Sequence, residues 1–208
     1  DADIIVAGGM ENMTRSPYLL PKARGGYRMG HDRIFDHMML DGLEDAYEPG
    51  RSMGTFGEDC AAKYGFTRAE QDAFATASVQ RAKAATESGA FAAEITPVTV
   101  KGRGGDVVVS IDEGPGKVKL DKIPTLKPAF KKDGTITAAS SSSINDGAAA
   151  LVMMRASTAA QLGSKPLARI MAHAVHAQAP NWFATAPVGA VNKVLSKAGW
   201  TVADVELW

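Results

Sequence analysis

A run of hydroxyl-bearing residues is the part of this sequence best suited to binding chemistry. Four serines stand together at residues 140–143, shortly after Thr137, and an Asn-Asp-Gly turn follows at residues 145–147. Such a run forms either a flexible linker or a polar loop whose hydroxyls and amides are held at the edge of a sheet. An apolar stretch, residues 148–154, begins directly after the turn. A flexible linker would not be expected to end in such a stretch. We therefore predict either a loop that binds a polar ligand or a well-capped turn.

The four histidines do not have the spacing of a helical zinc site, in which two histidines lie one turn apart. His173 and His176 are three residues apart beside a predicted strand, so we expect them on opposite faces. We interpret these two, with His31 and His37, as structural or surface residues. No metal ligand set is predicted.

The single cysteine and the paired carboxylates are weak candidates for catalysis. Cys60 lies in a predicted helix directly after Glu58 and Asp59, and neighbouring carboxylates disfavour the reactive thiolate, so we expect Cys60 to pack. Glu44-Asp45 and Glu58-Asp59 are adjacent pairs whose spacing does not suit an acid and base acting across a substrate. We predict surface positions for both pairs, and no complete catalytic group in this chain.

The composition excludes several classes of function. The 208 residues carry 23 basic and 23 acidic side chains, so a nucleic-acid-binding protein is not indicated, although a local basic patch remains open. No apolar run approaches a membrane span, and no signal peptide is recognised. One cysteine excludes an internal disulfide and fits a reducing compartment, so we expect a cytoplasmic protein.

Helices must position these residues, and the sequence marks several of them. A helix is predicted over residues 55–64, and a short one over 35–40. Thr67 and Glu70 have the spacing of a capping box, which predicts a helix to about Ser88. We expect its packing face to carry small residues and one aromatic, at Ala69, Ala73, Phe74, Ala77, Ala84 and Ala85. Two further helices are predicted, one over 157–163 capped by Ser157 and one over 187–198.

Strands are predicted at both ends of the chain and in one hairpin. Residues 4–7 and 148–154 are short apolar runs typical of strands buried on both faces of a parallel sheet, and 167–175 and 205–208 are further candidates. Residues 95–100 and 107–111 flank a glycine-rich loop and predict a hairpin. The pattern is an α/β sheet at both ends with a large insert, such as forms a lid or binding subdomain. Strands at both chain ends suggest an internal fragment.

Several segments resemble the thiolases, the acetyl-CoA acetyltransferase family. The resemblance covers essentially the whole chain and rests on many short matches in order, each weak alone. They are residues 7–18 (AGGMENMTRSPY), 24–30 (RGGYRMG), 41–43 (DGL), 53–54 (MG), 70–75 (EQDAFA), 101–103 (KGR), 126–130 (LKPAF), 145–150 (NDGAAA) and 198–200 (AGW).

The resemblance implies a five-layer αβαβα fold with an inserted α+β loop domain over the active site. Residues 1–14 would end the N-terminal half and 15–143 would form the loop domain. Residues 144–163 would give the last strand of that half and its connection, and 164–208 the start of the C-terminal half.

The resemblance also implies binding and assembly residues. Ser142 matches a serine that hydrogen-bonds the pantetheine arm of coenzyme A, although residues 139–143 (ASSSS) depart from the family's pattern there. Leu43, Met53, Phe130 and Ala138 match residues that line the acyl and pantetheine tunnel, with ordinary core packing as the alternative. The loop carrying Arg24, Gly25, Gly26, Arg28 and Met29 resembles one through which members form tetramers. Ser52 stands where biosynthetic members often have histidine.

The implied activity of the parent enzyme is acyl transfer to and from coenzyme A, by thiolysis of 3-oxoacyl-CoA or Claisen condensation of acetyl-CoA. Acyl-CoA is then a substrate, no cofactor is permanently bound, and a dimer or tetramer is expected. The catalytic cysteines and histidine of the family would lie outside residues 1–208, so the chain alone is predicted inactive. Two alternatives remain: a thiolase-like protein that binds acyl chains or lipid without catalysis, and a ketosynthase acting on carrier-protein thioesters.

Overall fold

The computed structural model describes residues 2–208 as a mixture of helices and short antiparallel strand pairs. The chain divides into two compact units. Unit 1 comprises Asp1–Cys60 and Ser143–Trp208, and unit 2 comprises Ala61–Ser142.

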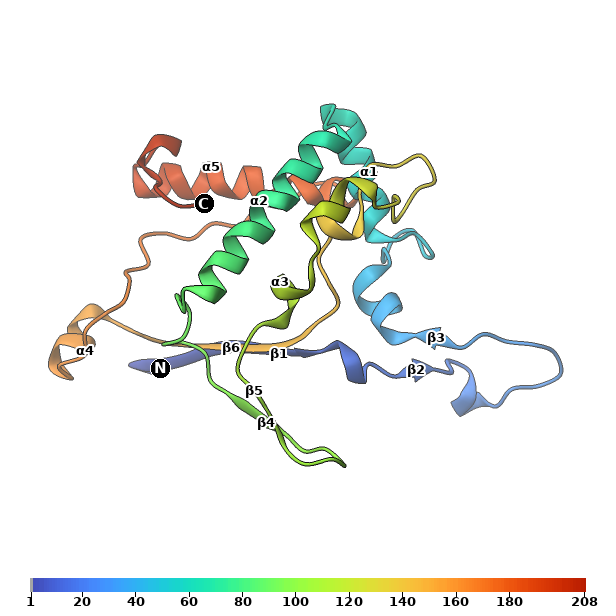
Figure 1. Cartoon of the computed structure of the whole chain (residues 1–208), viewed down its shortest axis with the longest axis horizontal. Helices are drawn as coiled ribbons and strands as arrows, with labels where there is room; N and C mark the ends of the chain where they lie inside the picture. The colour runs from blue at the N-terminus through green and yellow to red at the C-terminus, as the bar shows by residue number, and fades with distance from the viewer. Residues whose placement is uncertain (1) are drawn as a thin grey trace. The chain divides into compact units, whose positions relative to one another are not determined.

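A two-stranded ribbon is the main feature of unit 1. Strand β1 (Ile4–Asn12) pairs antiparallel with β6 (Asp146–Met154), and Gly8 lies opposite Ala150 (Figure 1). The Asp146 carboxylate accepts a hydrogen bond of 2.9 Å from the Thr14 amide. This contact ties the end of the ribbon, directly after the hydroxyl-rich loop, to the chain that leaves β1.

The prediction that these strands are buried in a parallel sheet is wrong. Their pairing is antiparallel, and Val6 and Val152 are 71% and 66% exposed. Alternation and composition indicate a strand but do not encode the direction of its neighbour. In residues 2–208 the sheet has two strands, and two strands cannot bury apolar side chains between layers.

The rest of unit 1 consists of short elements joined by loops. Residues Tyr18–Leu19 (β2) and Phe35–Asp36 (β3) pair, and a π-helical turn (η3, Met39–Leu43) follows. Helix α1 (Met53–Tyr64) comes next, and its last turn belongs to unit 2. The predicted helix over 35–40 is therefore wrong at its start, because Phe35 and Asp36 are bound to β2. Toward the C-terminus lie α4 (Ala156–Gln161), the 3-10 helix η6 (Pro180–Thr185), α5 (Ala186–Ala198) and η7 (Val202–Asp204).

Two strand predictions near the C-terminus are also wrong. Residues 164–179 and 205–208 belong to no strand. Extended apolar sequence becomes a strand only when a partner supplies the ladder hydrogen bonds, and these segments have no such partner in residues 2–208. The Ser157 cap is wrong as well, because α4 begins one residue earlier with Arg155 at the cap. The helix over 187–198 is confirmed as α5, with Pro187 in its first turn and Gly199 left-handed at φ +70°.

Unit 2 is organised around one long helix. Helix α2 (Arg68–Glu87) begins with the predicted capping box, in which Thr67 and Glu70 satisfy each other's backbone amides. The predicted hairpin is confirmed as β4 (Val98–Val100) and β5 (Val107–Val109), an antiparallel pair (Figure 1). Short helices α3 (Glu113–Lys117), η4 (Leu120–Thr125) and η5 (Ala138–Ser140) follow.

The packing face of α2 differs from the small-residue face expected from sequence. Ala75 is 2% exposed, whereas Phe74 is 76% exposed. Arg68 and Asp72 lie one turn apart on the partly buried side with Ala75. A polar pair occupies this face because it binds backbone carbonyls of η4, which apolar side chains cannot do. The centre of unit 2 is formed by Ala75 with Ile123 and Thr137, which are 1% and 0% exposed.

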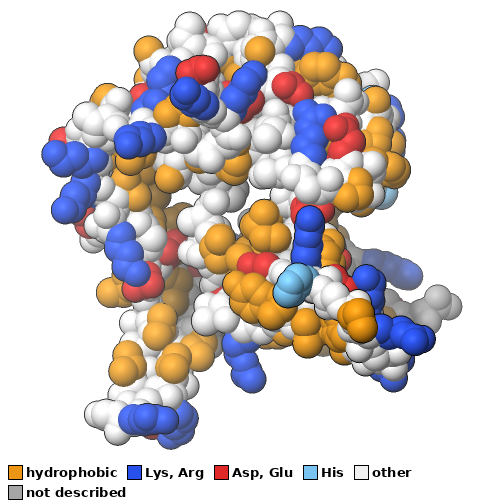
Figure 2. All heavy atoms as spheres, turned by 90° about the vertical axis from the view of Figure 1, so that its right-hand side faces the viewer, with side chains coloured by type: hydrophobic (Ala, Val, Ile, Leu, Met, Phe, Trp, Pro, Cys, Tyr) orange, Lys and Arg blue, Asp and Glu red, His pale blue; other side chains and the backbone are white. Residues whose placement is uncertain are grey.

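Hydrophobic side chains remain exposed over much of the face shown in Figure 2. They include residues of the ribbon, the hairpin and the loop after β2. Within residues 2–208, no helix combines the length and apolar character needed to cross a membrane.

Candidate functional site

The hydroxyl-rich loop is a tightly capped turn. The Thr137 hydroxyl accepts a hydrogen bond from the Ala139 amide at 3.2 Å, and the Ser140 hydroxyl accepts one from the Thr137 amide at 3.0 Å. The Ser141 hydroxyl donates to the Thr137 carbonyl at 2.7 Å. Three hydroxyls are thus committed within the loop, and the side chain of Ser142 is exposed at its end. A flexible linker is not indicated for the first half of the run, because Ser140 and Ser141 are half-buried and bonded to Thr137, which is fully buried.

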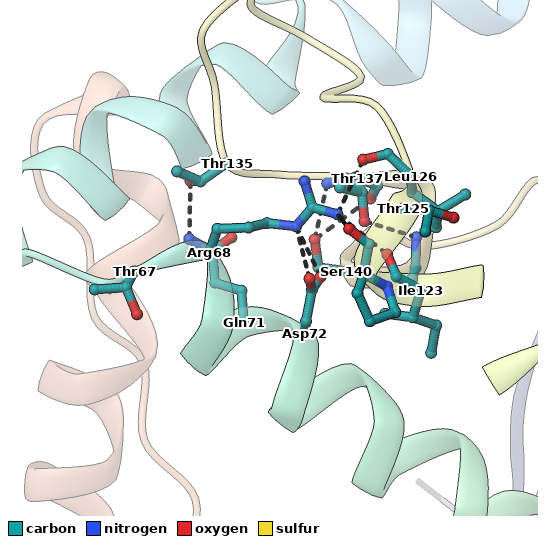
Figure 3. A network of polar contacts seen from close by, with 12 residues as sticks. Thr67, Arg68, Gln71, Asp72, Ile123, Thr125, Leu126, Thr135, Thr137 and Ser140 are labelled. Atoms are coloured by element: carbon teal, nitrogen blue, oxygen red, sulfur yellow. Dashed lines mark hydrogen bonds and ion pairs between the residues drawn. The ribbon is translucent and has the colours of Figure 1, made fainter. Parts of the chain in front are cut away.

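Arg68 at the start of α2 holds the turn that precedes this loop (Figure 3). Its Nη2 donates to the carbonyl oxygens of Ile123 and Leu126, at 3.1 and 2.9 Å. Its Nε donates to both carboxylate oxygens of Asp72, at 2.9 and 2.8 Å. The Ile123 carbonyl also accepts from the Leu126 amide at 3.2 Å, so the guanidinium adds a second partner there and ties the carbonyl just past the end of η4 to α2.

A second contact from the same helix holds the chain farther on. The Gln71 side chain donates to the Thr135 hydroxyl at 2.8 Å, a contact also visible in Figure 3, and to the Phe66 carbonyl at 3.2 Å. Between the two contacts the chain folds back on itself, since the Ala129 amide donates to the Ile136 carbonyl at 2.9 Å. Residues 126–135 therefore form a loop whose two ends are attached to consecutive turns of α2.

The segment leading into this loop is strongly basic, although the whole chain is neutral. Residues 117–132 contain six lysines and one acidic residue, Asp121. All six lysines are exposed. Two of them are paired, Lys117 with Glu113 and Lys122 with Asp121. The others make no ion pair within residues 2–208, so their charges are available to an anion: Lys119, Lys127, Lys131 and Lys132.

The five predicted binding residues fall into both units. Phe130, Ala138 and Ser142 belong to unit 2, where Phe130 lies inside the attached loop, Ala138 is the first residue of the capped turn η5, and Ser142 follows that turn. Leu43 and Met53 belong to unit 1, at the end of η3 and the start of α1, and both are half-buried. The structure thus brings together three of the five in one unit.

Sequence reasoning missed Arg68, Gln71, Asp72 and the lysines. Arg68 and Asp72 have the (i, i+4) spacing of a helical ion pair, and this signal was available. The basic segment could have been found by counting charges locally instead of over the whole chain.

A carboxylate and an arginine order the loop between Leu43 and Met53 in unit 1. Asp45 is 7% exposed, and its carboxylate accepts hydrogen bonds from the amides of Tyr47 and Glu48, at 3.0 and 2.6 Å. The Arg51 side chain pairs with Glu48 at 2.9 Å. The predicted surface position of Asp45 is therefore wrong, because its carboxylate replaces backbone partners that the turn lacks.

An aromatic contact anchors the first turn of α1. Phe56 is 1% exposed, and the Arg51 guanidinium lies 3.7 Å from its ring centroid. The Phe183 ring meets it edge to face, with centroids 6.0 Å apart. Glu58, on the same helix, is 6% exposed, so its predicted surface position is also wrong. Cys60 is a free, half-buried thiol near the end of this helix.

The loop with the predicted assembly residues is closed by an ion pair. Lys22 and Asp32 lie 2.7 Å apart, and this contact raises the pKa of Lys22 and lowers the pKa of Asp32. Between them Arg24 and Gly25 belong to the 3-10 turn η2 (Ala23–Gly25). The following residues are exposed, among them Gly26 at φ +79°, Arg28 and the fully exposed Met29.

Two of the histidines have defined packing or hydrogen-bonding roles. The His176 ring packs against Gly189 of α5, and its Nε2 lies 3.2 Å from the Gln178 amide oxygen. His37 lies 3.3 Å from the Ser16 hydroxyl. No group of three metal-binding side chains was found within residues 2–208.

One cavity of about 370 Å³ lies in unit 2. Its walls come from the end of α2, the following turn, and residues 110–115. Neither lysine nor arginine is among its lining residues, and its one charged residue is Asp112, whose carboxylate caps α3. This lining does not suit a phosphate-bearing ligand.

Comparisons with known proteins identify relatives over the whole chain. Residues 1–157 match the thiolase N-terminal domain, and residues 164–208 match the thiolase C-terminal domain. The acetyl-CoA acetyltransferase of Chromobacterium violaceum is 50% identical, over 100% of this chain and 53% of that protein. Acetyl-CoA acetyltransferase 1 of Arabidopsis thaliana is 47% identical, over 99% of this chain and 50% of that protein.

Solved structures of acetyl-CoA acetyltransferases are also similar to this chain over nearly its whole length. The acetyl-CoA acetyltransferase of Syntrophomonas wolfei matches with a TM-score of 0.90 and 42% identity, covering 99% of this chain and 52% of that one. The Bacillus anthracis acetyl-CoA acetyltransferase matches with a TM-score of 0.92 and 39% identity, at the same coverage. This chain spans about half the length of the relatives it matches.

Proposed function

Since the chain belongs to the thiolase family, we propose that it forms the coenzyme A-binding part of an enzyme that transfers acyl groups to and from coenzyme A. The reaction is thiolysis of a 3-oxoacyl-CoA or the condensation of two acetyl-CoA molecules. Acetyl-CoA acetyltransferases among the relatives support this substrate class. The family match favours this function over that of a ketosynthase.

The observation that carries the proposal is the basic segment that leads into the attached loop of unit 2. Coenzyme A bears several phosphates, and four exposed lysines without ion pairs lie at 119–132. Lysine side chains bind phosphate as point charges. Phe130 lies within this stretch, and Ala138 and Ser142 follow it, so exposed apolar side chains and an exposed hydroxyl lie near these lysines in the sequence. A pantetheine arm needs both of these.

In this proposal the reacting groups come from parts of the enzyme outside residues 1–208. Acyl transfer through a thioester needs an activated thiolate and donors aimed at the developing oxyanion. Cys60 does not fit the first role, because it is half-buried in the body of α1. Its role is packing, and the 208-residue chain alone transfers no acetyl groups.

The test replaces Ser142 with alanine in the full-length protein. Loss of one hydrogen bond to the pantetheine arm raises KM for coenzyme A about two- to tenfold and changes kcat less. Ser143→Ala is the matched control, because Ser143 is the adjacent exposed serine and its hydroxyl accepts from the Asn145 side chain instead. An unchanged KM in Ser142→Ala, or an equal change in both variants, would contradict the pantetheine assignment.

We further propose that the loop around Met29 is an oligomer contact of a cytoplasmic homo-oligomer. Tyr18, Leu20 and Ile34, which flank it, are 70%, 50% and 65% exposed, and Met29 is fully exposed. A cluster of apolar side chains on a loop closed by an ion pair supports contact with a second copy.

A further inference from the structure

We propose that Arg68 is a positioning residue for the coenzyme A site. It acts through the loop of residues 126–135, which carries Phe130 and three of the lysines, and does not itself touch the ligand. This inference rests on the function proposed above. It is drawn from the contacts of α2 with the two ends of that loop.

The guanidinium of Arg68 contacts both the backbone at the end of η4 and the side chain of Asp72. Its Nη2 reaches three carbonyl oxygens at the end of η4, those of Ile123, Pro124 and Leu126. Its Nε is held by the Asp72 carboxylate, whose side chain is only 13% exposed. The planar fork of arginine can serve both sets of acceptors at once, whereas the ammonium of lysine is a single point donor. The direction in which the chain leaves η4 therefore depends on Arg68.

The loop that begins at Leu126 has a second attachment to α2. Its far end is held by the hydrogen bond from Gln71 to Thr135, one turn along the same helix. The backbone hydrogen bond from Ala129 to Ile136 narrows its base. Phe130 and the exposed Lys131 lie between these attachments. Release of the Leu126 end leaves the loop attached to α2 at one end only, while the Ala129–Ile136 hydrogen bond still closes its base.

Release of one end of the loop is expected to weaken the binding of coenzyme A. A loop that is ordered before binding loses less conformational freedom when the ligand arrives, so its release weakens affinity. The reacting groups lie elsewhere in the enzyme, so turnover at saturation is spared. Arg68→Lys is expected to raise KM for coenzyme A about three- to tenfold with kcat within about twofold of wild type.

The experiment measures steady-state thiolysis by the full-length wild type, Arg68→Lys and Arg81→Lys. Arg81 lies on the same helix, is exposed and makes no side-chain hydrogen bond or ion pair with the loop in the described part of the chain, so Arg81→Lys matches the change in chemistry. A raised KM in Arg68→Lys alone supports the proposal. A lowered melting temperature with unchanged KM shows a purely structural role and overturns it, as does a loss of kcat with unchanged KM.

Asp72→Asn keeps the proposal testable if Arg68→Lys does not fold. This variant leaves the arginine in place but removes the charge that orients it, so a smaller rise in KM is expected. An unchanged KM in folded Asp72→Asn would then overturn the proposal. A folded wild type without thiolase activity refutes the proposed function itself, and direct calorimetric titration with coenzyme A then decides whether Arg68 positions a binding site.

Discussion

Gly8 and Gly9 provide a matched pair of substitutions that tests the antiparallel ribbon of unit 1. A β-carbon added at Gly8 would lie 2.3 Å from the Ala149 carbonyl oxygen and 3.0 Å from the Ala150 α-carbon. Non-bonded carbon and oxygen atoms ordinarily lie at least about 3.3 Å apart, so the backbone of β6 must move by about 1 Å. Overpacking of this kind costs about 1–3 kcal/mol, more than the 0.4–1 kcal/mol that alanine gains by restricting the unfolded chain. A β-carbon at Gly9 would meet nothing within 4 Å.

The assay is urea unfolding of the full-length wild type, Gly8→Ala and Gly9→Ala, followed by circular dichroism. Gly8→Ala is expected to lower the free energy of unfolding by about 1–2 kcal/mol, and Gly9→Ala to leave it unchanged or raise it slightly. Equal effects of the two substitutions would refute the register in which Gly8 faces Ala150.

Three further predictions concern pH, packing and assembly. The hydrogen bond from the Thr14 amide lowers the pKa of Asp146. The stability that the carboxylate contributes is therefore present above its unfolded pKa and is lost as pH falls through its folded pKa. In an acid titration followed by circular dichroism, the loss of folded protein below about pH 4 should be flatter for Asp146→Asn than for the wild type. Gly189→Ala would place a β-carbon 2.6 Å from the His176 ring, so it should destabilise the protein in thermal melts by about 1–3 kcal/mol, and the added substitution His176→Ala should restore most of the loss. Met29→Glu should shift the protein to a smaller species in light scattering after gel filtration, because it places a charge in the proposed apolar contact.

Local signals in the sequence were sufficient for the elements that depend on neighbouring residues. The capping box of Thr67 and Glu70, the hairpin around the glycine-rich loop, and the stop of α5 at Gly199 were all predictable. Each of these depends on hydrogen bonds or backbone angles within a few residues, so a short stretch of sequence contains the information.

Elements that depend on distant partners were not predictable in the same way. The apolar composition of β1 indicated a strand but not its antiparallel partner more than 130 residues away. The apolar stretch at 167–175 has the composition of a strand and no partner within residues 2–208. Pairing is decided by tertiary contacts, which strand propensity does not contain.

The candidate site was predicted in part. The hydroxyl-rich loop was identified from its residues. That the hydroxyls of Thr137, Ser140 and Ser141 are bonded within the loop follows only from the structure. Ser142 stays a prediction that depends on the family resemblance. The role of Arg68 requires the carbonyl of Ile123, 55 residues away, which no local pattern indicates.

Thiolysis of acetoacetyl-CoA by the purified full-length protein is the most direct test of the central claim. Consumption of acetoacetyl-CoA should saturate with added coenzyme A and should weaken as salt screens the lysines of the basic segment. A folded protein that neither consumes acetoacetyl-CoA nor binds coenzyme A would contradict the account. Binding without turnover would favour the alternative of a thiolase-like protein that binds acyl groups without catalysis.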